Sequence, residues 1–437
     1  MKSFLGIDLG STTTKAVLLD DGGSVLGRGI TNSRSNYHLA ADIARDEANV
    51  DARFTLLDRA LEAAGETGEE AVQFRKRLLY HFRKVQQLAQ LASLRDKALV
   101  EARGGRLGHH GAPLEDRLAR LFEDLETNWR KPRLGGAARS DFFRDQASGD
   151  FARLAEKLAD RALPFDVLMS VFDKVIIQVE NERIDLTFEG NIRRALVSCL
   201  ENESPERRAR YEAAVLSVAD TPLDTVRSIG TGYGRQTLPF PKDSIRSEIL
   251  CHGLGAHVMF PKTTTVLDIG GQDTKAIQVD GDGIVTSFQM NDRCAAGCGR
   301  YLGYIADEMN MGVHELGPLA MQSTRHVKIN STCTVFAGAE LRDRLTMGQR
   351  REDILAGLHR AIILRAMALL ARSGGVADEF TFTGGVANNP AAVQALRQLV
   401  EENYGSRTLN ISPNSIFTGA LGAALFALRA SQEVANA

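Results

Sequence analysis

Residues 4–15 read Phe4-Leu5-Gly6-Ile7-Asp8-Leu9-Gly10-Ser11-Thr12-Thr13-Thr14-Lys15. Residues 266–275 repeat the pattern as Val266-Leu267-Asp268-Ile269-Gly270-Gly271-Gln272-Asp273-Thr274-Lys275. Each copy has an apolar strand, an aspartate, a glycine turn, a hydroxyl residue and a lysine. Glycine lets the backbone approach a polyphosphate closely, and the N–H groups of such a turn point at the anion. Two copies in one chain therefore predict two related lobes that face each other across a nucleotide.

The repeat extends beyond the two turns. After each turn a second apolar strand leads into an acidic glycine turn, at 20–23 in the first copy and at 280–283 in the second, and a third strand follows. Asp and Gly between apolar runs indicate a β-hairpin. We therefore expect each lobe to begin with three strands in the same order.

The residue types in the two turns suggest separate tasks. A carboxylate repels phosphate, so we expect Asp8 and Asp268 to organise a hydrated Mg²⁺ that lies between them and the phosphates. Gln272 is our candidate for orienting the attacking water, by analogy with glutamines of other NTPases. The pattern is not a Walker A loop, which has a second glycine before its lysine. The predicted phosphate contacts are Gly10, Ser11, Thr12, Thr13 and Lys15 in the first copy and Gly270, Gly271, Asp273 and Thr274 in the second.

A third glycine turn lies towards the end of the sequence. The strand expected at 379–382 enters a turn that reads Thr383-Gly384-Gly385-Val386-Ala387-Asn388-Asn389, and a helix follows. Such a turn can pack its backbone against an adenine or a ribose, so we expect Gly384, Gly385 and Asn388 to contact the adenosine. The alternative is an ordinary turn between a strand and a helix, because short motifs are prone to false positives.

Residues 36–189 interrupt this α/β pattern. The stretch is highly charged, and its apolar residues recur at three- and four-residue spacing, which predicts helices. We expect an inserted helical subdomain at 36–189, a first lobe formed by 1–35 and 190–262, and a second lobe at 263–437. The insertion is either a partner-docking module or a solvated appendage without catalytic work.

The composition narrows the class of protein. The chain has 437 residues and a net charge of −2, so no charge excess suggests nucleic acid or an anionic membrane as a partner. No stretch approaches the roughly 18 uninterrupted apolar residues of a membrane-spanning helix. A strand is expected almost at residue 1, which leaves no room for a signal peptide. We therefore expect a cytoplasmic enzyme.

The cysteines suggest a metal cluster. Their number is five, and an odd number in a cytoplasmic protein argues against a disulfide framework. Cys294 and Cys333 each precede a predicted helix, and helix N-termini favour thiolates. Two thiols from one chain cannot complete a four-cysteine ligand set, but a second subunit could supply two more. The alternative is a pair of buried, inert thiols.

Several motifs occur in an order that resembles one protein family. They are Gly6-Ile7-Asp8 with Gly10-Ser11-Thr12, Thr231-Gly232-Tyr233-Gly234-Arg235, Cys251-His252, Asp268-Ile269-Gly270-Gly271-Gln272-Asp273, Met290-Asn291-Asp292, Cys294-Ala295-Ala296-Gly297, Cys333-Thr334-Val335-Phe336-Ala337 and Thr383-Gly384-Gly385-Val386-Ala387. The sequence resembles the ATPase, or activator, family of benzoyl-CoA reductases and 2-hydroxyacyl-CoA dehydratases over 1–33 and 220–430.

The resemblance implies a fold, a cofactor set and partners. The implied fold is α/β, with two actin- or hexokinase-like (ribonuclease H-like) lobes around ATP and Mg²⁺. The resemblance also implies one 4Fe–4S cluster shared between two subunits, with Cys294 and Cys333 as the ligands from this chain. ATP hydrolysis would drive low-potential electrons from ferredoxin toward a catalytic partner that holds the acyl-CoA, because cluster geometry and burial set the cluster's potential.

Within this family, the length and the helical insertion most resemble the larger ATPase (alpha) subunit of ATP-dependent (class I) benzoyl-CoA reductase. We therefore predict an ATP-hydrolysing oxidoreductase subunit that serves catalytic iron–sulfur subunits, which dearomatise benzoyl-CoA. Cys298 replaces the usual threonine after the first cysteine motif. It is either a third thiol near the cluster or a small packing residue, and we expect packing. Gly338-Ala339-Glu340 departs from the Glu-Ser-Glu of simpler activators, which favours pseudo-symmetric pairing with a homologous ATPase subunit.

Three alternatives stay open. An activator of a 2-hydroxyacyl-CoA dehydratase would consume ATP once to start a catalytic cycle rather than at every turnover. A sugar or acetate kinase of the same superfamily would transfer the phosphoryl group and would need no thiol pair. A chaperone-like ATPase would use lobe closure to bind protein clients and would hold no iron.

Overall fold

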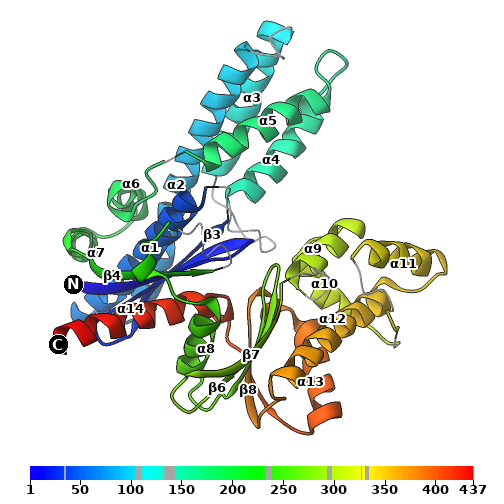
Figure 1. Cartoon of the computed structure of the whole chain (residues 1–437). Coiled ribbons are helices and arrows are strands. Elements are labelled where there is room, and N and C mark those ends of the chain that lie inside the picture. Colours follow the sequence, from blue (N-terminus) through cyan, green and yellow to red (C-terminus); the bar gives the residue numbers. More distant parts are fainter. Residues whose placement is uncertain are drawn as a thin grey trace. The chain divides into compact units, whose positions relative to one another are not determined.

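The computed structural model describes residues 1–33, 36–104, 110–131, 143–182, 184–232, 239–292, 298–325, 327–329 and 334–436. The chain forms two compact units, both drawn in Figure 1. The two-sheet unit comprises Met1–Ala48 and Leu223–Ala437, and the helical unit comprises Asn49–Pro222. This division does not test the bounds that we expect for the two lobes and the insertion, so those bounds remain a prediction.

The first sheet of the two-sheet unit has four strands. They are β1 (Lys2–Leu9), β2 (Thr13–Leu19), β3 (Val25–Asn32) and β4 (Asp224–Gly232). Their order is β3-β2-β1-β4; the β1–β2 and β2–β3 pairs are antiparallel, and the β1–β4 pair is parallel. β1 is buried along nearly its whole length, as is typical of a central strand rich in aliphatic residues.

The second sheet repeats the first. Its strands are β5 (Thr265–Ile269), β6 (Thr274–Val279), β7 (Val285–Asn291), β8 (Glu379–Thr383) and β9 (Thr408–Asn410), in the order β7-β6-β5-β8-β9. β5 pairs with β6 and β8 as β1 pairs with β2 and β4, and β9 extends the far edge. The predicted strand order of the two copies is therefore confirmed.

The two acidic glycine turns form the predicted hairpins. In each, the N–H of the first aspartate, Asp20 or Asp280, donates to the carbonyl oxygen four residues later at 2.9 Å. Each turn reaches a glycine in the left-handed region, with φ of 80° at Gly23 and 78° at Gly283. Residues with a side chain rarely adopt this conformation, so the glycine is needed at both positions.

Helices cover the two sheets. Those within the two-sheet unit are α8 (Glu248–Met259), α9 (Gly299–Glu308), α10 (Val313–Ala320), α11 (Thr334–Thr346), α12 (Arg351–Ser373), α13 (Pro390–Tyr404) and α14 (Thr418–Asn436). α14 packs on β1, β2 and β4, whereas α12 packs on β6, β7 and α13. α12 is long and apolar enough to pass a length-and-composition test for a membrane span, but most of that stretch is buried in the protein core.

α8 and α14 cross at glycines, which lets their backbones touch. A Cβ atom at Gly422 of α14 would lie 1.8 Å from the carbonyl oxygen of Cys251 in α8. A Cβ atom at Gly255 of α8 would lie 2.1 Å from the carbonyl oxygen of Thr418. No side chain fits at either position, so this crossing holds the first turn of α14 against α8.

The helical unit is built from long amphipathic helices. They are the second half of α1 (Tyr37–Ala63), α2 (Glu69–Arg103), α3 (Gly111–Arg130), α4 (Phe143–Leu158), α5 (Phe165–Glu180), α6 (Phe188–Cys199) and α7 (Pro205–Asp220). On α2, Phe74, Leu78 and Phe82 recur every four residues and are buried together. α6 and α7 begin at side-chain caps, Thr187 and Ser204. In Figure 1, α3 and α5 lie beside α2, which they contact.

Candidate nucleotide and metal site

Each sheet carries an aspartate–lysine pair at the same place. Asp8 and Lys15 are direct partners across β1 and β2, and Asp268 and Lys275 are direct partners across β5 and β6. Lys15 Nζ lies 3.6 Å from Asp8 Oδ2, and Lys275 Nζ lies 3.4 Å from Asp268 Oδ2. The repeat is therefore present in the side-chain geometry as well as in the strand order.

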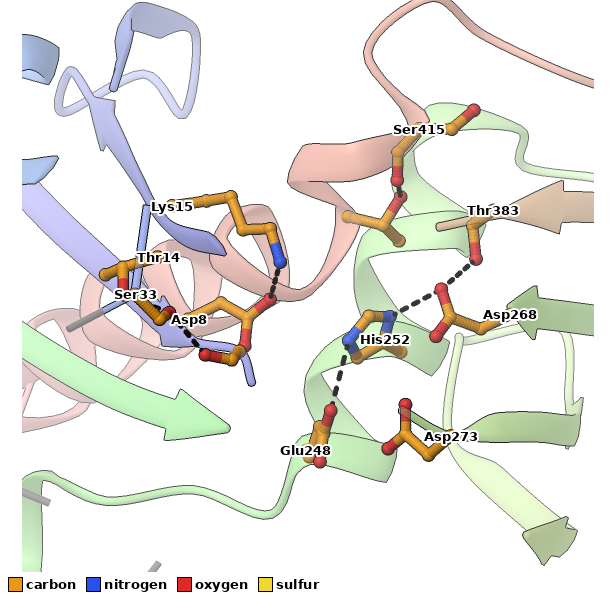
Figure 2. A network of polar contacts seen from close by, with 12 residues as sticks. Asp8, Thr14, Lys15, Ser33, Glu248, His252, Asp268, Asp273, Thr383 and Ser415 are labelled. Carbon is orange, nitrogen blue, oxygen red and sulfur yellow. Dashed lines mark hydrogen bonds and ion pairs between the residues drawn. The ribbon is translucent and has the colours of Figure 1, made fainter. Parts of the chain in front are cut away.

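Asp268 has charged or polar partners on both oxygens. Thr383 Oγ1 donates to Asp268 Oδ1 at 2.7 Å, and His252 Nδ1 lies 3.3 Å from the same oxygen (Figure 2). Burial by itself would raise the pKa of this carboxyl group, but His252 and Lys275 outweigh it and hold the pKa of Asp268 well below its usual range. Asp268 is therefore an ionised anchor for the groups around it.

Lys275 is the centre of a buried ion network. Its side chain is 1% exposed, and its Nζ lies 2.8 Å from Asp273 Oδ2 and 3.0 Å from Glu248 Oε1. Burial would lower the pKa of Lys275, yet the carboxylates of Asp268, Glu248 and Asp273 raise it above its ordinary value. The network joins the first turn of α8 to the second phosphate turn.

Glu248 and His252 lie one turn apart on α8. Burial disfavours a charged imidazole, but the charge of Asp268 outweighs it, so the pKa of His252 is raised. Burial raises the pKa of Glu248, and the neighbouring Lys275 only partly offsets that rise. In Figure 2, His252 lies between Glu248 and Asp268.

Asp8 differs from Asp268 although the two positions are equivalent. Asp8 is 3% exposed, and its Oδ1 has no hydrogen-bond partner among the residues that the structure describes. A buried carboxylate oxygen without a partner is costly unless a cation or a donor satisfies it. Asp8 is therefore the aspartate of the repeat that is suited to a cation.

Asp8, Glu248 and His252 form a group that could hold a metal ion. One ligand atom of each residue lies within 4.8 Å of the other two. Gly419 of α14 makes this approach possible, because a Cβ atom there would lie 2.6 Å from His252 Nε2 and 3.1 Å from Asp8 Oδ2. Asp8 and Glu248 supply the oxygen ligands that Mg²⁺ prefers. The raised pKa of His252 favours a protonated ring, so the two carboxylates are the part of this group that fits the predicted cation.

The two phosphate turns lie against each other. A Cβ atom at Gly271 would lie 2.2 Å from Thr12 Oγ1 and 3.4 Å from Ser11 Oγ. A Cβ atom at Gly10 would lie 2.8 Å from Lys15 Nζ. The structure thus brings together predicted phosphate contacts from both copies. Of the other predicted residues, Gly270, Gln272 and Asp273 lie in the second turn, and Thr13 and Thr274 begin β2 and β6, the strands that follow the two turns.

The third glycine turn leaves the end of β8. Gly384 has a φ of 85°, and Gly232 at the end of β4 has a φ of 126°. A Cβ atom at Gly232 would lie 2.2 Å from a carbonyl oxygen at the end of β1, and a Cβ atom at Gly384 would lie 2.3 Å from a carbonyl oxygen at the end of β5. The glycine that follows the strand therefore also belongs to the repeat. Gly385 and Asn388 are exposed in the 3₁₀ turn η4 (Gly385–Asn388), where a ligand can reach them.

The predicted cluster ligands Cys294 and Cys333 lie outside the described residues. α11 begins at Thr334, directly after Cys333 in the sequence, and α9 begins five residues after Cys294. Cys298 is 1% exposed and precedes α9, which agrees with the packing role expected of it.

The start of α9 is hydrogen-bonded to the second phosphate turn. Gly299 N–H donates to Gly270 O at 2.8 Å, and Arg300 N–H donates to Gly271 O at 2.8 Å. In the sequence, the stretch that contains Cys294 leads into these two residues. The second turn and the beginning of α9 are therefore joined directly through backbone hydrogen bonds.

Four residues of this site were not among those predicted from the sequence, namely Glu248, His252, Lys275 and Thr383. Lys275 could have been found by aligning the two copies, since it is the equivalent of Lys15. The Glu-x-x-x-His spacing on α8 was a weaker signal, because it places two polar side chains on one helix face without indicating what that face contacts.

Comparison with known proteins places the chain in a family. The model of the BadF/BadG/BcrA/BcrD ATPase family matches residues 5–427. The (R)-2-hydroxyglutaryl-CoA dehydratase activating ATPase of Acidaminococcus fermentans is 44% identical over 206 residues, which are 47% of this chain and 76% of that protein. One subunit of the benzoyl-CoA reductase of Thauera aromatica is 27% identical over 261 residues, which are 60% of this chain and 90% of that protein.

A solved structure shows the same fold. It is the activator of the 2-hydroxyisocaproyl-CoA dehydratase from Clostridium difficile with bound ADPNP, at a TM-score of 0.52 and 22% identity, covering 99% of this chain and 97% of that one. The predicted actin- or hexokinase-like α/β fold is confirmed. The comparisons favour the dehydratase-activator alternative over the predicted benzoyl-CoA reductase role. The family match over 5–427 shows that the chain belongs to the BadF/BadG/BcrA/BcrD ATPase family.

Proposed function

We propose that this chain is the ATP-hydrolysing activator of a 2-hydroxyacyl-CoA dehydratase. The proposal is supported by the family of ATPases to which the chain belongs and by its identity with a dehydratase activating ATPase. In this role, ATP hydrolysis drives a low-potential electron into the dehydratase, which then completes many turnovers. Ferredoxin is the proposed electron donor, and the cytoplasm is the proposed location.

The proposed electron carrier is one 4Fe–4S cluster, held by Cys294 and Cys333 together with two cysteines of a second ATPase subunit. The cluster would supply one-electron chemistry at low potential. Its position is supported by the helices α9 and α11, which begin soon after the two cysteines, because helix N-termini favour anionic ligands. The observation that carries the proposal is the pair of hydrogen bonds from Gly299 and Arg300 to the second phosphate turn.

The proposed nucleotide site uses the residues that the two turns bring together. Asp8 and Glu248 would hold the Mg²⁺ with their carboxylates, and His252 would lie beside them. Asp268 would act on the ion through water and through its contacts with His252 and Lys275. Gln272 would orient the attacking water. The proposed phosphate contacts are Gly10, Ser11, Thr12, Thr13, Lys15, Gly270, Gly271, Asp273 and Thr274, and the proposed adenosine contacts are Gly384, Gly385 and Asn388.

A second candidate is the ATPase subunit of a benzoyl-CoA reductase. It is favoured by the match with 90% of the length of the Thauera aromatica reductase subunit, although the identity is 27%. In that role, the chain would pair with a homologous ATPase subunit and would serve catalytic subunits that bind benzoyl-CoA. ATP would then be hydrolysed at every turnover.

The cluster is tested by anaerobic purification followed by iron and acid-labile sulfide analysis, for the chain alone and with its co-expressed partner subunits. Cys294→Ala should lose the cluster and retain ADP binding. Cys199→Ala is the matched control, because Cys199 is a buried thiol of the helical unit and should retain both. Absence of iron from every wild-type preparation would refute the electron-carrier role.

The two functions are separated by removing ATP after activation. A 2-hydroxyacyl-CoA dehydratase is reduced with the chain, ferredoxin and MgATP, and glucose with hexokinase then depletes the ATP. An activator predicts that dehydration continues through many turnovers. A reductase subunit predicts no dehydratase activation at any time, and benzoyl-CoA reduction that stops as soon as ATP is exhausted.

A further inference from the structure

Asn389 closes the third glycine turn and uses its whole side-chain amide in doing so. Its Oδ1 accepts hydrogen bonds from Ala391 N–H at 3.0 Å and Ala392 N–H at 3.2 Å, which caps α13. Its Nδ2 lies 3.0 Å from His359 Nε2. Because Oδ1 faces two donors, the amide orientation is fixed, and Nδ2 must donate to the imidazole.

His359 is buried in α12 and is held in one tautomer. Its Nδ1 lies 2.7 Å from Leu355 O, and a carbonyl oxygen can only accept, so Nδ1 carries the proton. Nε2 is then the lone-pair acceptor for Asn389 Nδ2. Burial lowers the pKa of His359 to about 4, which agrees with a neutral ring between one acceptor and one donor.

The turn is also confined from a third side. A Cβ atom at Gly317 of α10 would lie 2.6 Å from Asn389 Oδ1 and 2.8 Å from Pro390 Cδ. Asn389 is half-buried and is contacted by α10, α12 and α13, whereas Gly385 and Asn388, before it in the turn, are exposed. The exposed residues of the turn are therefore followed by a residue whose side chain is held by three helices.

We infer that His359 is a positioning residue for nucleotide binding, which it serves through its hydrogen bond to Asn389. The bond fixes the amide, the amide fixes both the start of α13 and the end of η4, and η4 presents Gly385 and Asn388 to the adenosine. The inference rests on the proposed adenosine contact of this turn. His359 does not touch the nucleotide in this arrangement.

The alternative is a core histidine whose two hydrogen bonds only stabilise the fold. Two substitutions separate the roles. In His359→Gln the Oε1 atom stands where Nε2 was and still accepts from Asn389, but the bond to Leu355 O is lost. In His359→Asn the Nδ2 atom still donates to Leu355 O, but the bond to Asn389 is lost. Each variant loses one neutral hydrogen bond, so similar thermal stabilities are expected.

The test is calorimetric titration of the full chain with MgADP, together with kcat and KM for ATP hydrolysis. His359→Asn should weaken ADP binding and raise the KM for ATP about tenfold, with kcat within about twofold, because one hydrogen bond that positions the turn is lost. His359→Gln should keep the ADP affinity within about twofold. Equal ADP affinities at equal thermal stability in the two variants would overturn the inference.

A third variant tests whether a loss of ADP binding comes from the lost hydrogen bond or from misfolding. Asn389→Ser keeps a good helix cap for α13 but removes the donor to His359. It should weaken ADP binding as His359→Asn does, and the double variant should be no weaker than either single one, because both remove the same bond. Additive losses would also overturn the inference. Failure of the wild type to bind MgADP would instead refute nucleotide binding itself.

Discussion

Asp8 and Asp268 illustrate how equivalent residues of a repeat acquire different surroundings. Asp268 is enclosed by Thr383, His252 and Lys275, whereas Asp8 has a buried oxygen without a described hydrogen-bond partner. Asp268→Asn should lower the free energy of unfolding by about 3 kcal/mol, since it leaves buried charges unbalanced. Asp8→Asn should change stability by less than about 1 kcal/mol, because loss of the ion pair with Lys15 is offset by no longer burying a carboxylate oxygen that has no described partner.

The same pair of variants should separate metal binding from stability. Asp8→Asn should weaken Mg²⁺ binding in ATP hydrolysis at least about 10- to 100-fold, the loss typical even of residues that only support a metal ligand. Urea denaturation and Mg²⁺ titration of the hydrolysis rate measure the two effects. A stable Asp268→Asn protein together with a destabilised Asp8→Asn protein would contradict the assignment.

His359 should make the protein sensitive to acid. The ordinary pKa of about 6.5 in the unfolded chain falls to about 4 in the folded protein because the ring is buried. Below pH 6.5 the unfolded chain therefore binds more protons, and stability falls as the pH drops from about 6.5 to about 4, by up to about 3 kcal/mol. His359→Gln should remove this part of the pH dependence. Denaturation of the wild type and of His359→Gln at several pH values measures this pH dependence. An equal loss of stability with falling pH in both proteins would contradict the prediction.

At the scale of elements, the α8–α14 crossing should tolerate no side chain. Gly422→Ala should destabilise the protein by about 3 kcal/mol, because the new Cβ would lie 1.8 Å from the carbonyl oxygen of Cys251. Gly149→Ala is the matched control at an exposed position of α4, where a Cβ atom would meet nothing within 4 Å. Gly149→Ala should raise the free energy of unfolding by about 1 kcal/mol, since alanine favours a helix. Thermal denaturation of both variants measures the difference, and equal midpoints would count against tight crossing.

The elements around the turns were the most predictable part of the fold. The two hairpins and the order of their strands follow from local patterns, because two apolar runs joined by an Asp–Gly turn specify a hairpin without help from distant residues. The pairing of β1 with β4 and of β5 with β8 could not be predicted in the same way. Each joins strands that are far apart in the chain, and periodicity does not encode the partner.

At the scale of the whole molecule, the two units have separate apolar cores. Calorimetry should therefore show two unfolding transitions. MgADP at about 100 times its dissociation constant should stabilise the two-sheet unit by about 2.7 kcal/mol and raise only its transition, because the predicted nucleotide contacts all lie in that unit. Gly149→Ala should move the other transition. A single transition that shifts as a whole with MgADP would contradict independent units.

The family and the fold were predicted correctly, whereas the comparisons favour the alternative function over the one predicted first. The benzoyl-CoA reductase prediction depended on chain length and the helical insertion, whereas sequence identity favours a dehydratase activator. The length of the chain reflects the inserted helical unit, which has its own core. It carries little information about the nucleotide site, because the predicted residues of that site lie in the two-sheet unit.

The sequence by itself determined the duplicated turn, its hairpins and the family, because these depend on residues that are neighbours in the chain. The tertiary structure decided which of the two aspartates keeps a buried oxygen without a described hydrogen-bond partner. Glu248 and His252 meet Asp8 and Asp268 through the packing of α8 between segments that are distant in the sequence. The charge state and partners of a buried group depend on such distances, and no local pattern contains them.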